Sequence, residues 1–211
     1  HPISVLNALR TYSQGHGERG RLTWDASPKI IDALNDAFYL TMDYLEPTGK
    51  RILLGIDVSG SMAGSLVSGI PNLSLDAASA AIAMVLMRQE PLCTVVYFNT
   101  STQQATLSPR QRLDDVIRAV QRVNGGGTDC AQPILYATEK KLPVDAFVIL
   151  TDNESWHGSI HPTQALAEYK RKMSIDAKLI SVAMANNASS ITDEVPNMLD
   201  VCGFDTSVPQ L

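Results

Sequence analysis

An apolar run that ends abruptly in a carboxylate is the feature that most constrains the fold of this chain. Residues 52–56 read Ile-Leu-Leu-Gly-Ile, and Asp57 follows at once. A strand that is apolar on both faces is typical of the centre of a parallel sheet covered by helices. Ligands bind such sheets beyond the carboxyl ends of the strands. The run therefore predicts a central strand that delivers Asp57 to the ligand-binding edge of a sheet.

From Lys50 onward, strand-like and helix-like segments alternate. The connection before the strand expected at 104–107 is too short for a parallel crossover, so that strand must pair antiparallel. The pattern predicts an α/β fold class, with a doubly wound, mostly parallel sheet and one antiparallel edge strand. We expect strands at residues 52–56, 93–98, 104–107, 146–151 and 178–184, and helices at residues 75–87, 112–123, 132–140, 163–173 and 197–201.

The first 46 residues have a different pattern, that of two helices separated by a glycine-rich break. Apolar residues between Ile3 and Leu9 recur at helical spacing. A second helix is expected to begin with Ser27 as its N-cap and Pro28 at its first position. We therefore expect a short α-helical stub at residues 1–46 and an α/β domain at residues 50–211.

Composition and charge exclude several classes of protein. The net charge is -5 and no block of like charges occurs, which argues against broad electrostatic binding of nucleic acid by this chain alone. No run approaches the roughly 18 apolar residues of a membrane span. The chain shows no signal peptide and begins without Met, so we expect a piece of a longer protein that does not contact a membrane. Its 3 cysteines are far apart, which favours a reducing, cytoplasmic location.

Oxygen donors gather at two predicted strand ends and in one glycine-rich loop. Asp57, Ser59 and Ser61 stand at alternating positions, so in an extended turn their three side chains can point the same way. The hydroxyl and carboxylate oxygens suit Mg²⁺ or Mn²⁺, and two carboxylates leave the ion able to accept one more anionic ligand. The candidate metal ligands are Asp57, Ser59, Ser61, Thr128 and Asp152.

Other chemistries fit these residues less well. Neither Ser59 nor Ser61 lies in the Gly-x-Ser-x-Gly pattern of a nucleophile elbow. His157 or His161 would have to act as the base of a serine hydrolase, and nothing in the sequence places either beside a serine. A Walker phosphate loop would need a lysine just before Thr128, where the chain has glycine. A purely structural role, in which the carboxylate and the serines cap a turn, stays open.

These motifs resemble the von Willebrand factor A domains and their metal-ion-dependent adhesion site. The similar residues are Asp57-x-Ser59-x-Ser61, Thr128 in Gly-Gly-Thr-Asp, and Thr151-Asp152. The resemblance implies that the two serines and Thr128 contact Mg²⁺ directly, while the aspartates often act through water. This sequence departs from the family pattern at Asn153, where the family usually has glycine.

A second resemblance covers nearly the whole chain. The segments that carry it are similar to the last helical-repeat segment and the A-domain of the sixty-kilodalton Ro autoantigen (TROVE) family. They are Ala8-Leu-Arg-Thr-Tyr, Gly15-His-Gly-x-Arg-Gly, Glu46-Pro-Thr-Gly-Lys-Arg, Gly126-Gly-Thr-Asp-Cys, residues 147–154, His161-Pro and Cys202-Gly-Phe-Asp. The resemblance implies a ribonucleoprotein component that binds Y RNA and the ends of misfolded RNA. Bacterial relatives work with an exoribonuclease in RNA quality control.

We therefore expect a Mg²⁺-dependent binding module, not an enzyme. Its ion would be completed by an anionic group of a partner, either a protein carboxylate or an RNA phosphate. Two alternatives remain open at this point. The chain could be a metal-assisted or serine hydrolase, or its A-domain could only close the helical ring.

Overall fold

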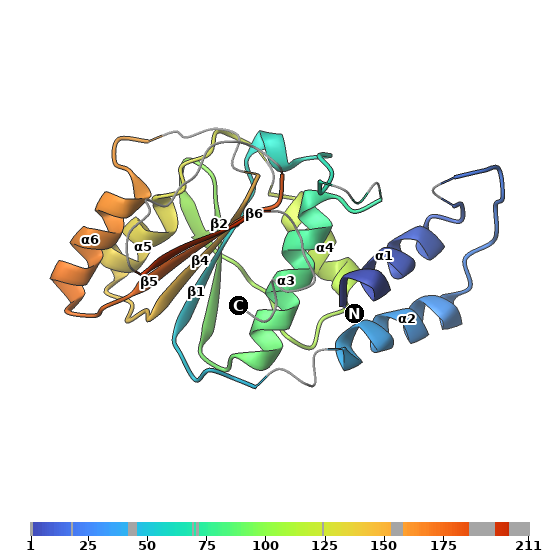
Figure 1. The fold of residues 1–211 in the computed structure, drawn as a ribbon, viewed down its shortest axis with the longest axis horizontal. Helices are drawn as coiled ribbons and strands as arrows, with labels where there is room; N and C mark the ends of the chain where they lie inside the picture. Colours follow the sequence, from blue (N-terminus) through green and yellow to red (C-terminus); the bar gives the residue numbers. More distant parts are fainter. Residues whose placement is uncertain are drawn as a thin grey trace.

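The structure is a computed structural model, and it describes residues 2–17, 19–41, 46–68, 70, 72–123, 125–152, 158–185 and 197–202. A twisted sheet runs through the middle of the α/β domain, with helices on both of its faces (Figure 1). Two further helices, at the N-terminal end of the chain, extend from one side of this core (Figure 1). The chain thus has two N-terminal helices beside an α/β core.

The sheet has six strands in the order β3-β2-β1-β4-β5-β6. All neighbouring pairs are parallel except β2 and β3, which are antiparallel and lie at one edge. This confirms the predicted fold class. The strands are β1 (Ile52–Asp57), β2 (Cys93–Phe98), β3 (Thr102–Gln104), β4 (Ala146–Thr151), β5 (Lys178–Ala183) and β6 (Met198–Cys202).

The helices form one layer on each face of the sheet. Helices α3 and α4 share a core with the stub helices α1 and α2, and α5 and α6 form the core of the other face. Among the residues described, no helix is both long and apolar enough to cross a membrane. The helices are α1 (Pro2–Ser13), α2 (Pro28–Leu40), α3 (Leu75–Gln89), α4 (Leu113–Gln121), α5 (Gln132–Lys140) and α6 (Pro162–Met173), with a 3-10 turn η1 (Gly60–Met62).

Strand β1 is buried on both faces, as its sequence predicts. Leu54 and Ile56 pack toward α3 and α4, whereas Leu53 packs toward α5 and α6, because side chains alternate along a strand. Gly55 lies between them, and a Cβ at this position would be 2.8 Å from Cγ of Pro133 in α5. The missing side chain thus lets the first turn of α5 lie directly against the central strand.

Two local predictions need correction. The segment expected to form a last helix at residues 197–201 is strand β6, which pairs parallel with β5. So short an apolar run fits both the helical and the strand spacing of apolar residues, so pairing with the neighbouring strand decides which structure forms. The antiparallel strand is Thr102–Gln104 rather than 104–107, because a tight turn brings Thr102 opposite Phe98. Ser27 is the N-cap of α2 as predicted, but its side chain makes no capping hydrogen bond.

Candidate metal centre

Asp57 and Asp152 arrive at the same place because β1 and β4 are neighbours. Asp57 is the last residue of β1, and Asp152 follows the last residue of β4. The two strands pair in parallel with Ile56 opposite Leu150. The strand order runs outward in opposite directions from this pair, so their carboxyl ends form the switch point where ligands bind such sheets. Both aspartates are buried, with 0% and 1% of their surface exposed.

The carboxylate of Asp57 is held by two hydrogen bonds. The backbone N–H of Ser59 donates to Oδ1 at 2.8 Å, and the hydroxyl of Thr151 donates to Oδ2 at 2.7 Å. Burial nevertheless raises the pKa of Asp57 to about 6, and the nearby charge of Asp152 adds to the rise while the hydrogen bonds oppose it. A divalent cation beside these carboxylates would favour their charged forms.

The two serines lie in the turn that follows β1. Oγ of Ser59 and Oγ of Ser61 are 3.2 Å apart, so the two hydroxyls face the same space. Ser59 is buried and Ser61 is half-buried. The turn closes as η1, in which the N–H of Met62 donates to the carbonyl of Ser59 at 3.2 Å. The alternation read from the sequence therefore brings both hydroxyls to one side of the turn.

The glycine-rich loop before α5 is hydrogen-bonded to this serine turn. The N–H of Gly60 donates to the carbonyl of Gly126 at 3.0 Å, and the N–H of Gly125 donates to the carbonyl of Val58 at 2.7 Å. Gly126 has a φ of +81°, a conformation that side chains disfavour. The two loops thus form one unit, and the second loop carries Thr128.

Thr128 has a buried hydroxyl that no described residue binds. The residue is 1% exposed, and its Oγ1 has no hydrogen-bond partner in the described part of the chain. Leaving a buried polar group unpaired costs about 1–3 kcal/mol, and most proteins avoid it. A ligand that this hydroxyl contacts would remove that cost.

Asn99 is a positioning residue that the sequence did not reveal. Its side-chain Nδ2 donates to the carbonyl of Gly125 at 2.8 Å, and its backbone carbonyl accepts from the N–H of Asp129 at 3.1 Å. Both contacts fix the loop that carries Thr128. Its position in the sequence could have indicated this role, because Asn99 is the first residue after β2 and β2 is a neighbour of β1 in the sheet.

Two further groups beside the loop have structural roles. The Asp129 carboxylate accepts from the N–H of Ala131 at 3.1 Å and from Nε2 of Gln132 at 2.9 Å, so it fixes the turn that leads into α5. Cys130 is 1% exposed, and burial raises the pKa of its thiol, with the charge of Asp57 adding to the rise. Burial therefore disfavours the thiolate form of this sulfur in the chain without a metal.

The composition of the site favours a hard cation over the other chemistries considered. In the ranges that the structure describes, no three His, Cys, Asp or Glu side chains come together as a metal cluster. The donors at this edge are mainly hydroxyls with two carboxylates, a set that suits Mg²⁺ better than Zn²⁺. His161 stands at the N-cap of α6, where Nδ1 accepts from the N–H of Thr163 at 3.4 Å. His157 and Asn153 lie outside the described residues.

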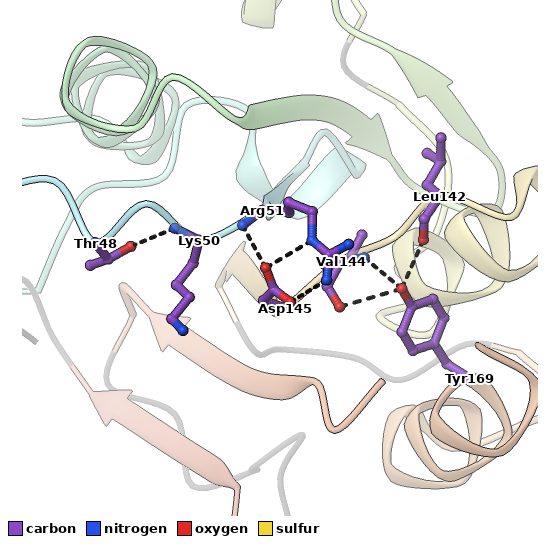
Figure 2. Close-up of polar contacts among 7 residues, drawn as sticks. All are labelled: Thr48, Lys50, Arg51, Leu142, Val144, Asp145 and Tyr169. Carbon is purple, nitrogen blue, oxygen red and sulfur yellow. Dashed lines mark hydrogen bonds and ion pairs between the residues drawn. The ribbon is translucent and has the colours of Figure 1, made fainter. Parts of the chain in front are cut away.

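The opposite, amino edge of the sheet also carries polar side chains, and these are satisfied. The guanidinium of Arg51 binds the carboxylate of Asp145 through two N–H groups at 2.5 and 2.9 Å (Figure 2). The hydrogen bonds from Arg51 lower the pKa of Asp145 to about 2. The hydroxyl of Tyr169 accepts from the N–H of Val144 at 2.6 Å and donates to the carbonyl of Leu142 at 2.7 Å (Figure 2).

The chain resembles known proteins over its whole length. A family profile described as the Ro60 vWA domain matches residues 51–211. The chain is 42% identical over 212 residues to the RNA-binding protein RO60 of Deinococcus radiodurans, which is 100% of this chain and 40% of that protein. It is 40% identical to the protein of the same name from Caenorhabditis elegans, covering 100% of this chain and 33% of that protein.

A solved structure agrees with these matches. The crystal structure of the Deinococcus radiodurans RO (RSR) protein aligns with a TM-score of 0.84 and 40% sequence identity. The alignment covers 99% of this chain and 42% of that one. The chain therefore spans less than half the length of the relatives it matches.

Proposed function

Because this chain belongs to the family of the Ro60 vWA domain, we propose that its α/β domain is a non-enzymatic binding module that meets a partner through a divalent cation. The cation, Mg²⁺ or Mn²⁺, binds at the carboxyl edge of the sheet. Ser59, Ser61 and Thr128 supply hydroxyl ligands, and Asp57 and Asp152 supply the negative charge. An anionic group of the partner completes the coordination.

One observation carries this proposal, the buried and unpartnered hydroxyl of Thr128 in a loop bonded to the serine turn. Hydroxyls, carboxylates and water are the ligands that Mg²⁺ and Mn²⁺ take in proteins. The raised pKa of Asp57 agrees with a site that lacks its counter-charge. The cation would supply that charge and polarise the partner's anionic group, and the protein would hold its own oxygens in place.

The partner follows from the relatives. Two of them are named RNA-binding proteins, so we propose that the whole protein binds RNA, including Y RNA and misfolded RNA, in RNA quality control. Its partner at the metal is then an RNA phosphate or a carboxylate of a protein such as an exoribonuclease. The cysteine content makes the cytoplasm the proposed location.

Calorimetric titration with Mg²⁺ and with Mn²⁺ tests the site. Thr128→Val removes only the unpartnered hydroxyl, and Asp57→Ala removes a carboxylate. We expect the affinity to fall about tenfold or more in both variants, since a ligand worth over about 1.4 kcal/mol is lost. The matched control is Thr102→Val, because Oγ1 of Thr102 is also buried and has no partner among the described residues, but lies in β3. The titrations of the wild type and the three variants include acetate, which can complete the coordination of the ion. Equal affinity in all four proteins would contradict the proposed site and support the alternative in which the domain only closes the helical ring.

Crosslinking to RNA separates the two kinds of partner. RNA bound through the metal should crosslink in Mg²⁺ and not in EDTA, and Asp57→Ala should abolish the difference. Crosslinking that is unchanged in the variant would count against a phosphate ligand and leave the protein carboxylate.

A further inference from the structure

A pocket of about 510 Å³ lies between the helical stub and the α/β domain. Helix α2 supplies Asn35, Asp36 and Tyr39, the last turn of α3 supplies Arg88, and the segment before α4 supplies Arg110 and Arg112. None of the candidate metal ligands lines it. Its volume falls in the range of about 300–1,000 Å³ that is usual for small-molecule sites.

The pocket gathers positive charge in a chain that is acidic overall. Its lining contains three arginines and a single carboxylate, that of Asp36, although the chain's net charge is -5. Arg112 also donates from Nη1 to Oδ1 of Asp32 at 2.7 Å, an ion pair exposed at the rim. The lining therefore keeps an excess of cationic N–H donors, which favours an anionic ligand.

The guanidinium of Arg88 is held in place before any ligand arrives. It lies 3.3 Å from the centroid of the Tyr39 ring, and its Nε donates to the carbonyl of Pro109 at 2.8 Å. These contacts leave its terminal N–H groups available. The Arg110 side chain makes no ion pair or hydrogen bond that involves another described residue.

Asn35 adds an uncharged donor to the pocket. The residue is 9% exposed and lines the pocket, and its amide makes no hydrogen bond in the ranges that the structure describes, although the amide atoms are not themselves buried. Asparagine is a poor helix former, and Asn35 lies in the middle of α2. The amide is therefore available to donate a hydrogen bond to a ligand in the pocket.

We propose that this pocket binds a phosphate group, with the guanidinium groups of Arg88, Arg110 and Arg112 and the amide of Asn35 as its donors. The planar fork of a guanidinium matches two phosphate oxygens, and such charge-assisted hydrogen bonds are stronger than neutral ones. The volume exceeds what a phosphate alone needs, so the group is carried by a larger molecule. That molecule is a small phosphorylated compound of nucleotide size or the 5′ end of an RNA.

The test is calorimetry in EDTA, which keeps the proposed metal site out of the measurement. The probes are inorganic phosphate, adenosine 5′-monophosphate, and one RNA oligonucleotide with a 5′-phosphate or a 5′-hydroxyl. We expect saturable binding of phosphorylated probes that weakens about tenfold in Arg110→Gln and in Asn35→Ala, since each removes a donor to a charged group. The matched control is Arg122→Gln, which removes the same charge from the C-cap of α4 outside the pocket.

Three outcomes would overturn the proposal. They are no saturable binding of any probe, equal weakening by all three variants, and equal binding of the two oligonucleotides without binding of the small probes. The first would leave an empty cleft, and the second would mean attraction by net charge alone. If the nucleotide binds as tightly as the phosphorylated oligonucleotide, the ligand is a small molecule, and if the oligonucleotide binds more tightly, it is an RNA end. Arg110 is exposed, so its variant keeps the test valid even if Asn35→Ala does not fold.

Discussion

The two edges of the sheet use the same kinds of residue in opposite ways. At the amino edge, Asp145 is held by the guanidinium of Arg51, and the hydroxyl of Tyr169 binds two backbone groups. At the carboxyl edge, Asp57 is buried with another carboxylate nearby and has a raised pKa, and the hydroxyl of Thr128 has no partner among the described residues. Both edges contain carboxylates and hydroxyls, but the Tyr169 hydroxyl has its partners within the chain, whereas the Thr128 hydroxyl has none among the described residues.

Under the proposed function, this difference separates groups that hold the fold together from groups that wait for a ligand. A satisfied polar group stabilises the folded chain, so its removal should lower the free energy of unfolding. A group that is buried without its partner destabilises the folded chain, so its removal should cost little or even stabilise it. Substitutions at the two edges should therefore change stability with different sizes and signs.

The largest change in stability is expected for Tyr169→Phe at the amino edge. The variant leaves the N–H of Val144 and the carbonyl of Leu142 without a buried partner and should lower the free energy of unfolding by about 2 kcal/mol. Urea denaturation measures this. The matched control is Tyr97→Phe, because the hydroxyl of Tyr97 is buried without a partner, and that variant should be nearly neutral. Equal losses in both variants would remove the distinction between used and unused hydroxyls.

A smaller loss, about 1 kcal/mol, is expected for Asp145→Asn. The side chains of Arg51 and Asp145 are 40% and 27% exposed, so solvent screens the pair. The pKa of Asp145 is lowered to about 2, so its stabilisation is complete above about pH 4, where the unfolded chain is also ionised, and is lost as the pH falls toward 2. Urea denaturation from pH 7 downward should show the wild type and the variant converging. A difference that persists at low pH would assign the effect to packing.

The opposite sign is expected for Asp57→Asn in EDTA. The amide keeps the shape of the side chain without its buried charge, so the variant should gain up to about 1 kcal/mol at pH 7, where the carboxylate is ionised. Saturating Mg²⁺ should reverse the order, because the metal stabilises only the wild type. Thermal unfolding in EDTA and in Mg²⁺ measures both. A variant that is less stable in EDTA would show that the Asp57 carboxylate is structural like that of Asp145.

The smallest change in stability is expected for Thr128→Val. Valine has nearly the same shape, and the lost hydroxyl has no partner among the described residues, so the free energy of unfolding should stay within about 0.5 kcal/mol. Urea denaturation in EDTA checks this. A loss near that of Tyr169→Phe would mean that the hydroxyl already serves the fold.

Much of the fold could be predicted because its strands are long, apolar and bounded by clear turns. The segments 93–98, 132–140 and 146–151 have the boundaries that their sequences indicate. The last strand could not be predicted, because β6 depends on pairing with β5 and its own five residues fit both helical and strand spacing. The edge strand β3 begins earlier than expected for a similar reason, since the geometry of the turn after β2 sets its register.

The candidate site was predictable in part. Asp57, Ser59 and Ser61 follow one strand and could be read as a group, and the pairing of β1 with β4 brings Asp152 beside them. Contacts between loops could not be read from the sequence, because residues such as Asn99 and Gly125 are far apart along the chain. The pocket that contains Arg88 and Arg110 was missed for the same reason, since α2, α3 and the segment before α4 meet only in the folded chain.

The glycine in the middle of β1 limits how this protein can change through evolution. Any side chain at Gly55 would press on Pro133 of α5, on Ile149 and on Phe98, so the helix would have to move outward. The loop that carries Thr128 leads directly into α5 and would move with it. A substitution in the core of the sheet would thus alter the shape of the candidate site at its carboxyl edge. Changes in what the site binds must therefore come from its loops, while the central strand stays as it is.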